Sequence, residues 1–470
     1  MPSIPSTHDI SIERFDTVAQ PFLQQDGLPF ADILGAEDIR QAFVEHDALF
    51  ACDDIYSTDV VLWAFLAQTL RDGKGAACTR AVSDIRTYRT HVGGPAPSPN
   101  TGDYCRARAK LSRQVLRRLA RQTAKRLEQQ ARKPWLWRGL HAKLVDGSTF
   151  TMPDTPDNQR AFPQPASQQP GLGFPIARIC VILSLATGCV HDWAMGPCQG
   201  KATGETALLR KMLDDFEPGD VAVFDRYYCS YMMLAALQLR GVHVCARLHQ
   251  CRSDDVRFAK VLGPHDHLVT WRRPERPDWM SESQYAAIPE TLTLRQMEYE
   301  VSESGSRSET ITVVTTLLDP QAYSAEHVAE LYGYRWHAEL DLFQLKQTLN
   351  LDHVRCKSPD MVAREVWTTL LAYNLIRKVI ATAAAVHDKE PRKLSFTGAC
   401  SALASSWMLL TTGSPRDVAK QWRTALETIA TGKVGNRPGR IEPRVLKRRR
   451  HHYPLMTKPR GQLRAEAQKT

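Results

Sequence analysis

Residues 332–346 read YGYRWHAELDLFQLK, and this stretch decides how the rest of the sequence is interpreted. Four of its polar side chains are separated by three, four and seven residues, which predicts that they share one face of a helix: Tyr332, Arg335, Glu339 and Lys346. A carboxylate beside cations suits a metal site that binds a phosphate chain, because the cations hold the phosphates next to the metal. An ordinary ion pair would explain Arg335 with Glu339, but not the other two residues.

Two aspartates elsewhere in the sequence can supply further metal ligands. Asp146 follows the strand-like residues Lys143-Leu-Val145 and Asp225 follows the apolar residues 221–224, so both are predicted at the ends of strands. Phosphoryl transfer on nucleic acid is well served by two Mg²⁺ ions about 3.5–4 Å apart, and such hard cations need carboxylates. A strand-end aspartate is also common in turns and helix caps, so both interpretations stay open for each residue.

These three acidic motifs together resemble those of the bacterial DDE transposases of the insertion-sequence-4 family. The family's hallmark is Tyr, two residues, Arg, three residues, Glu, six residues, Lys, and residues 332–346 match that spacing throughout. Asp146-Gly-Ser resembles the first acidic motif, and Asp225-Arg-Tyr-Tyr resembles the second. Residues 100–111 resemble part of the family's N-terminal domain and residues 437–449 a tail frequent in its members, so the resemblance covers nearly the whole chain.

The resemblance implies an α/β fold with a ribonuclease-H-like catalytic core, a β-rich insertion and a preceding helical DNA-binding domain. It implies that Asp146, Asp225 and Glu339 are catalytic and bind two Mg²⁺ ions, or Mn²⁺ in their place. Six other aspartates have no matching motif and are predicted to lie in caps, in turns or on the surface: Asp192, Asp215, Asp220, Asp254, Asp255 and Asp341.

The resemblance also implies how the motif contacts DNA. Three side chains would contact the transposon end: Tyr332, Arg335 and Lys346. Trp336 occupies a position where related enzymes use an aromatic side chain near a flipped base during hairpin formation. A tryptophan in a helix is more often part of the core, and Trp271 or Trp279 could serve equally.

The surplus of positive charge lies in two short segments. The chain has 61 Lys and Arg against 51 Asp and Glu, a net charge of +10. Residues 105–133 hold 11 basic residues against one acidic residue, and residues 433–470 hold 12 against two, so each segment carries +10. Such segments suit a polyanionic partner, and a solvated surface or a solubilising tail is the alternative.

The first basic segment is predicted to form one amphipathic helix, because apolar residues recur near every 3.6 positions and no Gly or Pro interrupts them. Five basic residues line another face and are predicted to bind DNA phosphates: Arg106, Lys110, Arg113, Arg117 and Arg121. The second basic segment is too charged and too rich in proline to form a core, so it is predicted as an extended arm.

The patterns of strands and helices divide the chain into five predicted parts. They are a helical DNA-binding domain (1–133), a catalytic core in two parts (134–248 and 320–432), a β-rich insertion (249–319) and the basic arm (433–470). Strands are predicted at residues 143–145, 176–185, 189–195, 221–224 and 242–248, with an insertion pair at 292–301 and 310–318.

The sequence also excludes several classes of protein. It has no apolar run of about 18 residues, and residues 1–26 lack the pattern of a signal peptide. The 11 cysteines are scattered and none is spaced CxxC, which indicates neither disulfides nor a zinc knuckle. We therefore expect a protein of the bacterial cytoplasm, without a membrane partner, that lies on the nucleoid when it is bound to DNA.

The favoured hypothesis is cut-and-paste transposition by a homodimer that binds transposon-end DNA and target DNA. Two alternatives stay open. One is a DNA-binding derivative that no longer catalyses, which the three intact carboxylates disfavour. The other is a nuclease of the same fold that does not transpose.

Overall fold

The computed structural model describes residues 36–468, with gaps at 51–54, 72, 92, 201–202, 253–255, 258, 302–308, 413–414 and 435–455. Residues 437–449 of the predicted arm, Asp254 and Asp255 therefore lie outside the described residues. The chain divides into two compact units. The helical unit comprises residues 1–144, 181–193 and 337–434, and the sheet unit comprises residues 145–180, 194–336 and 435–470.

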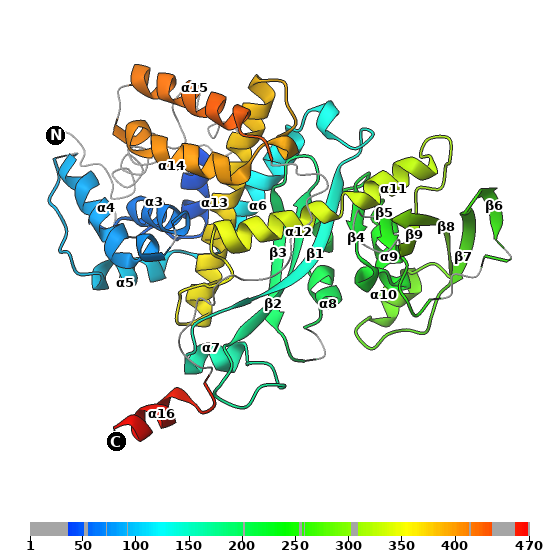
Figure 1. The fold of residues 1–470 in the computed structure, drawn as a ribbon, viewed down its shortest axis with the longest axis horizontal. Coiled ribbons are helices and arrows are strands. Elements are labelled where there is room, and N and C mark those ends of the chain that lie inside the picture. Colours follow the sequence, from blue (N-terminus) through cyan, green and yellow to red (C-terminus); the bar gives the residue numbers. More distant parts are fainter. Residues whose placement is uncertain are drawn as a thin grey trace, which may run out of the picture. The chain divides into compact units, whose positions relative to one another are not determined.

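The strands form one nine-stranded sheet in the order β3-β2-β1-β4-β5-β9-β8-β7-β6, which confirms a mixed α/β fold (Figure 1). The beginnings of β1 and β3 (residues 142–144 and 190–193) and the end of β2 (residues 181–184) belong to the helical unit, and the rest of the sheet belongs to the sheet unit. The strands are β1 Ala142–Thr151, β2 Ile176–Ser184, β3 Val190–Pro197, β4 Val221–Phe224, β5 His243–Arg247, β6 Lys260–Gly263, β7 Asp266–Arg272, β8 Thr291–Val301 and β9 Glu309–Thr315.

The centre of the sheet follows directly from its sequence. All four residues of β4 are buried, as expected of a continuous apolar run that is covered on both faces. Strand β4 pairs in parallel with β5, and helix α9 (Tyr231–Gln238) makes the crossover that parallel neighbours need. Helix α11 (Ala325–Gly333) packs on both strands. The sheet unit also contains α7 Pro156–Ala161, α8 Glu205–Arg210, η3 Leu213–Asp215, η4 Arg226–Tyr228, α10 Glu282–Ala287 and α16 Arg460–Ala467.

The predicted strand pair of the insertion is confirmed as β8 and β9. They pair antiparallel from Arg295↔Thr315 to Val301↔Glu309. On its other side, β9 pairs antiparallel with β5 of the central sheet. The buried guanidinium of Arg295 on β8 binds both carboxylate oxygens of Asp266 on β7, with Nε–O distances of 2.9 and 3.1 Å. The insertion therefore extends one edge of the sheet and has its own buried ion pair.

Helix α13 (Pro359–Val386) is the centre of the helical unit. It packs against α6 (Arg113–Gln129), α3, α14 and α15. Among the described residues it is the one helix long and apolar enough to cross a membrane, and 83% of its apolar window is buried inside the protein. The unit's other helices are α2 Ala36–Glu45, α3 Thr58–Thr69, η1 Gly73–Ala76, α4 Cys78–His91, α5 Gly102–Lys110, η2 Lys133–Trp135, α12 Trp336–Phe343, the π-helix η5 Gln344–Thr348, η6 Pro391–Lys393, α14 Phe396–Thr412 and α15 Pro415–Thr431.

A buried ionic cluster joins α12, α13 and η6. The carboxylate of Asp341 is 1% exposed and accepts hydrogen bonds from Arg377 and from Nη1 of Arg392, the latter at 2.6 Å. Arg392 also donates from Nε to the carbonyl of Leu185 at 2.8 Å, which connects the cluster to the end of β2. Asp341 is therefore a structural anion, where the sequence predicted a cap, a turn or a surface charge.

We expect Asp341→Ala to lower the free energy of unfolding by about 3–5 kcal/mol, because it leaves the buried guanidinium of Arg377 and the largely buried one of Arg392 without their anion. The control is Glu390→Ala, which breaks the exposed Glu390–Lys393 pair and should cost less than about 1 kcal/mol. Urea denaturation followed by circular dichroism measures both. Equal midpoints for the two variants would contradict the structural role of Asp341.

Candidate active site

Two of the three predicted carboxylates lie on neighbouring strands of the sheet unit. Strands β1 and β4 are adjacent, and Asp225 directly follows β4, where its Oδ1 accepts a hydrogen bond from the backbone N–H of Arg226 at 2.6 Å. Asp146 lies within β1, because the β-prone residues after Gly147 continue the strand to Thr151. The prediction that Asp146 ends a strand was wrong. Both carboxylates are half-buried.

A further carboxylate, that of Glu205 on α8, lies against Gly147, the residue after Asp146. A Cβ atom on Gly147 would be 2.2 Å from Cδ of Glu205, so the absence of a side chain on Gly147 makes room for this carboxylate. The hydroxyl of Tyr228 donates to Oε2 of Glu205 at 3.1 Å. Sequence analysis did not predict Glu205, because α8 has no motif and only the glycine after Asp146 indicates a close approach.

Burial and neighbouring carboxylates shift the pKa values of Glu205 and Tyr228 upward. Burial raises the pKa of Glu205, and the nearby charge of Asp225 raises it further. Burial likewise raises the pKa of Tyr228, with contributions from Glu205 and Asp146 among its neighbours. The Glu205 carboxylate and the protonated phenol of Tyr228 therefore form a hydrogen-bonded pair next to the strands that carry the first two acidic motifs.

The motif of residues 332–346 is not one continuous helix. Helix α11 ends at Gly333, Tyr334 and Arg335 form a turn, and α12 begins at Trp336. Glycine is a poor helix former, which accounts for a break at this point. From Gln344 the backbone forms a π-helix, which changes the angular spacing of the side chains. The prediction of a single continuous helix was therefore wrong, and residue spacing alone does not place all four side chains on one helical face.

Tyr332 lies near Asp225 within the sheet unit. Its side chain is 9% exposed, and burial raises the pKa of its hydroxyl, opposed by Arg335 and supported by Asp225. In the helical unit, Glu339 lies half-buried in the first turn of α12, and Lys346 pairs with Asp352 at an Nζ–Oδ1 distance of 3.1 Å. The structure thus brings Tyr332 and Arg335 to the second aspartate motif.

The three candidate tryptophans differ in exposure. Trp336 is 56% exposed and Trp279 is 48% exposed, whereas Trp271 is only 8% exposed and lies under the guanidinium of Arg252. Arg210 lies over the ring of Trp279, 3.9 Å from its centre. The prior expectation that a helical tryptophan belongs to the core does not hold for Trp336. Burial makes Trp271 unsuitable for stacking on a base.

The basic segment 105–133 forms two helices instead of one. Helix α5 ends at Lys110, and α6 begins after Ser112, whose hydroxyl accepts a hydrogen bond from the N–H of Val115. Because the chain turns at Leu111 and Ser112, the five basic residues do not form a stripe along one helix. Arg106 and Lys110 lie on α5, and Arg113, Arg117 and Arg121 lie on α6.

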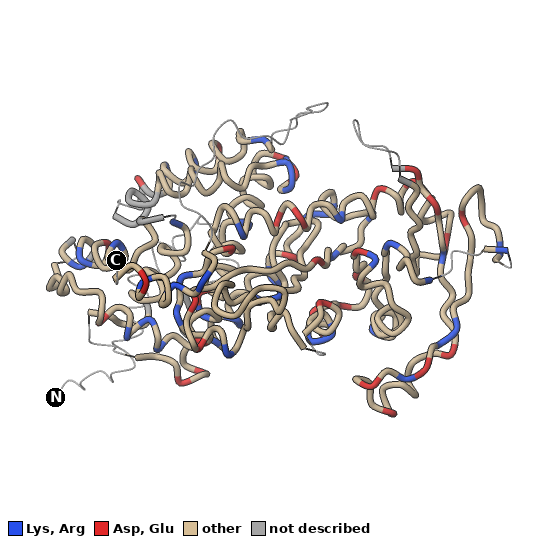
Figure 2. The backbone as a smooth tube through the Cα atoms, turned by 60° about the horizontal axis from the view of Figure 1, so that its bottom comes forward, with Lys and Arg blue, Asp and Glu red and all other residues tan. Residues whose placement is uncertain are grey.

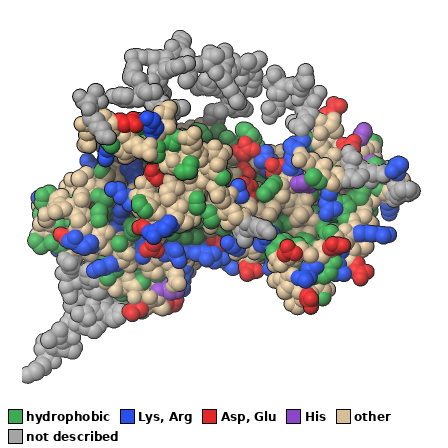
Figure 3. Space-filling view, turned by 90° about the horizontal axis from the view of Figure 1, so that it is seen from below, with side chains coloured by type: hydrophobic (Ala, Val, Ile, Leu, Met, Phe, Trp, Pro, Cys, Tyr) green, Lys and Arg blue, Asp and Glu red, His purple; other side chains and the backbone are tan. Residues whose placement is uncertain are grey.

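Several of these cations have partners within the helical unit. Arg117 pairs with the buried carboxylate of Asp192 at 3.0 Å, and Arg121 lies 3.7 Å from the same oxygen. Arg106 pairs with Asp103, while Arg113 is exposed. Asp192 is thus an ion-pair partner, not a cap. Lys and Arg are interspersed with Asp and Glu along much of the described chain (Figure 2) and on the face drawn in Figure 3.

Residues 137–375, a little over half of the chain, match the family model of the transposase DDE domain. The chain belongs to the DDE transposase family. Transposase InsG for insertion sequence element IS4 of Escherichia coli (strain K12) is 27% identical over 451 residues, 95% of this chain and 97% of that protein. The transposase for insertion sequence element IS421 of Escherichia coli is 40% identical over 68 residues, 14% of this chain and 18% of that protein.

The piggyBac transposase in a synaptic complex with hairpin DNA is similar with a TM-score of 0.42 and 10% sequence identity, over 89% of this chain and 82% of that one. The family match and the full-length relative identify the chain as a DDE transposase of the insertion-sequence-4 family. It is therefore a metal-dependent enzyme that cleaves DNA and transfers its strands. The matched segment includes Asp146, Asp225 and Glu339.

We expect Gly147→Ala to displace the carboxylate of Glu205 and break its hydrogen bond with Tyr228, at a cost of about 1–3 kcal/mol in the free energy of unfolding. In a Glu205→Ala background the same methyl group has room. The two substitutions should therefore be non-additive by about 0.5–3 kcal/mol in a double-mutant cycle measured by urea denaturation.

Gly333→Ala is the matched control for this cycle, because a Cβ atom there meets nothing within 4 Å. It should leave stability unchanged or slightly raised, in either background. Additive effects of Gly147→Ala and Glu205→Ala would contradict the close approach of these two residues.

Proposed function

We propose that this transposase moves its insertion sequence by a cut-and-paste route. A homodimer would bind the terminal inverted repeats, hydrolyse the phosphodiester at each element end with Mg²⁺, pass through a hairpin and join the ends to target DNA in the bacterial cytoplasm. The observation that carries the proposal is the position of Asp146 and Asp225 on adjacent strands, within the segment that matches the DDE domain.

Asp146, Asp225 and Glu339 are the residues that would hold the metal ions. Around β1 and β4 the donors are carboxylate oxygens, the ligand type that both Mg²⁺ and Mn²⁺ prefer, so the site fits the cofactor. When bound, two such ions supply an activated water and stabilise the leaving 3′ oxygen. Glu205 supports this arrangement through Tyr228, the last residue of the Asp225-Arg-Tyr-Tyr motif, whose hydroxyl donates to the Glu205 carboxylate and so connects α8 to that motif.

The motif residues near Asp225 would position the DNA end. The raised pKa of Tyr332 keeps its hydroxyl protonated, so it can donate a hydrogen bond to a phosphate oxygen. Arg335 and Lys346 would neutralise phosphate charge, with Arg335 suited to a bidentate contact. Trp336 would stack on a flipped base, a role supported by its exposed ring.

The chain is divided into proposed parts, and basic residues in the first of them would contact DNA phosphates. The proposed parts are a helical DNA-binding domain in residues 1–133, a ribonuclease-H-like core in residues 134–248 and 320–432, the β-rich insertion 249–319 and a basic arm 433–470. Arg106, Lys110 and Arg113 would contact phosphates. Arg117 and Arg121 would do so while they share Asp192.

We expect Asp146→Asn, Asp225→Asn and Glu339→Gln each to slow end cleavage by about 100-fold or more, because each removes charge that stabilises the reacting phosphate. Binding to end DNA should persist in a mobility-shift assay. The control is Asp214→Asn, whose carboxylate is 93% exposed and should be dispensable. Normal cleavage by any of the three variants would overturn the assignment.

The same assay separates the two alternative functions. Supercoiled target DNA is added, and joined products are resolved on gels. Joining of cleaved ends supports transposition, whereas cleavage without joining indicates a nuclease. Binding of end DNA by the unmodified protein with no cleavage in Mg²⁺ or Mn²⁺ would indicate a DNA-binding derivative.

We expect Trp336→Ala to impair hairpin formation more than the first nick. A stacked base contributes about 1–3 kcal/mol, which corresponds to a slowing of the hairpin step by about 5- to 150-fold. Trp279→Ala is the control, since its ring is similarly exposed. Denaturing gels separate nicked from hairpin DNA. Equal loss of both products, or loss of the hairpin in the Trp279 variant alone, would contradict the role of Trp336.

A further inference from the structure

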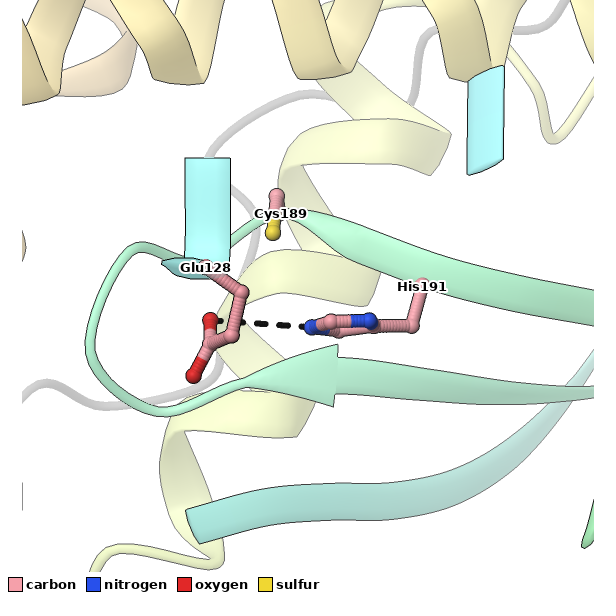
Figure 4. Close-up of side chains that lie close together, drawn as sticks. All are labelled: Glu128, Cys189 and His191. Carbon is pink, nitrogen blue, oxygen red and sulfur yellow. Dashed lines mark ion pairs between the residues drawn. The ribbon is translucent and has the colours of Figure 1, made fainter. Parts of the chain in front are cut away.

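A second group of metal-ligating side chains lies in the helical unit, on different elements from the catalytic carboxylates. Glu128 is at the end of α6, Cys189 directly precedes β3, and His191 is the second residue of β3 (Figure 4). One ligand atom from each residue lies within 4.8 Å of the others. All three side chains are buried, with exposures of 6%, 0% and 7% respectively.

The backbone around Cys189 is fixed by a tight turn. Ser184 N–H donates to the Cys189 carbonyl at 2.9 Å, and Gly188 N–H donates to the Ser184 carbonyl at 3.0 Å. Gly188 has a φ of +77°, a conformation that favours glycine. This turn fixes the backbone position of Cys189, so the chain would not need to rearrange to bring its sulfur near His191.

Two buried atoms of this group face each other without a hydrogen bond. Oε1 of Glu128 accepts a hydrogen bond from Nδ1 of His141 at 2.7 Å, whereas Oε2 has no hydrogen-bond partner. Nε2 of His191 also has none, and it lies 3.6 Å from Oε2. Buried polar atoms are rarely left without a hydrogen-bond partner.

The spacing of these two atoms suits a shared metal ion. Metal–ligand bonds of about 2.0–2.1 Å place two ligands of a tetrahedral Zn²⁺ about 3.4 Å apart, close to the observed 3.6 Å. A simple ion pair between Glu128 and a protonated His191 would explain these two residues. The thiol of Cys189 accepts a hydrogen bond from the Thr187 hydroxyl at 3.0 Å and donates to the Ala124 carbonyl at 3.7 Å, and a metal ion would add its sulfur as a third ligand.

We propose that Glu128, Cys189 and His191 bind one zinc-class transition-metal ion through Oε2, Sγ and Nε2. A thiolate, an imidazole and a carboxylate select Zn²⁺ over Mg²⁺, which prefers an all-oxygen site. A sulfur–metal bond replaces the S–H bond, and the released proton goes to solvent. Two anionic ligands and one neutral ligand then balance the dication, and water takes the fourth position.

His141 acts as the positioning residue of this site. Its hydrogen bond occupies Oε1, which directs Oε2 toward His191 and restricts Glu128 to one oxygen–metal bond. The ion would fasten the end of α6 to the turn before β3. It would therefore stabilise the helical unit without taking part in DNA chemistry.

Co²⁺ serves as a spectroscopic probe of the site in the full-length protein after treatment with a chelator. We expect about one equivalent to bind, with the visible bands of a tetrahedral ion and a thiolate-to-cobalt charge-transfer band. Zn²⁺ should displace it, whereas excess Mg²⁺ should not. His141→Ala should weaken Co²⁺ binding by about 10- to 100-fold.

Cys189→Ser should abolish the charge-transfer band while leaving the Glu128–His191 pair and the fold intact, as judged by circular dichroism. Cys245→Ser is the matched control, because Cys245 is equally buried and lies in the sheet unit, and it should keep the band. Asp225→Asn should also keep it, which separates this site from the catalytic one. No stoichiometric Co²⁺ binding, or a band that survives in Cys189→Ser, would overturn the proposal.

Discussion

The adjacency of β1 and β4 is the constraint on which the proposed catalytic arrangement depends. It brings the backbones of Asp146 and Asp225 to neighbouring strands, where two half-buried carboxylates repel each other unless cations or protons compensate them. Glu205 adds a third carboxylate, and its raised pKa reflects the cost of burial at this place. In a metal-dependent enzyme this unfavourable energy favours metal binding, because the bound cations remove the repulsion between the carboxylates.

Other buried carboxylates of the chain are compensated differently. Asp341 and Asp192 face guanidinium groups of arginine, so their charges are balanced within the protein. Glu128 faces two imidazoles and a thiol, a softer set of partners. The environment of each carboxylate therefore separates the structural anions, the proposed catalytic ligands and the proposed transition-metal site, although all are acidic residues in the same sequence.

The sequence predicted those features that depend on local pattern. The buried run of β4 and the position of Asp225 after it could be recognised, because the apolar run stops at the aspartate. The continuation of β1 past Asp146, the break after Gly333 and the π-helix depend on packing and backbone geometry, which residue spacing does not determine. Glu205 and the Glu128 group depend on contacts between distant segments, so no single motif indicates them.

Iron-directed cleavage tests most directly whether Asp146, Asp225 and Glu339 share one metal site. Fe²⁺ replaces Mg²⁺ in the complex with end DNA, ascorbate and peroxide generate hydroxyl radicals at the ion, and mass spectrometry maps the cut peptide bonds. We expect cuts beside all three residues, suppressed by excess Mg²⁺ and unaffected by Cys189→Ser. Cuts beside only one or two of the three, or cuts that Mg²⁺ does not suppress, would contradict a common catalytic metal site.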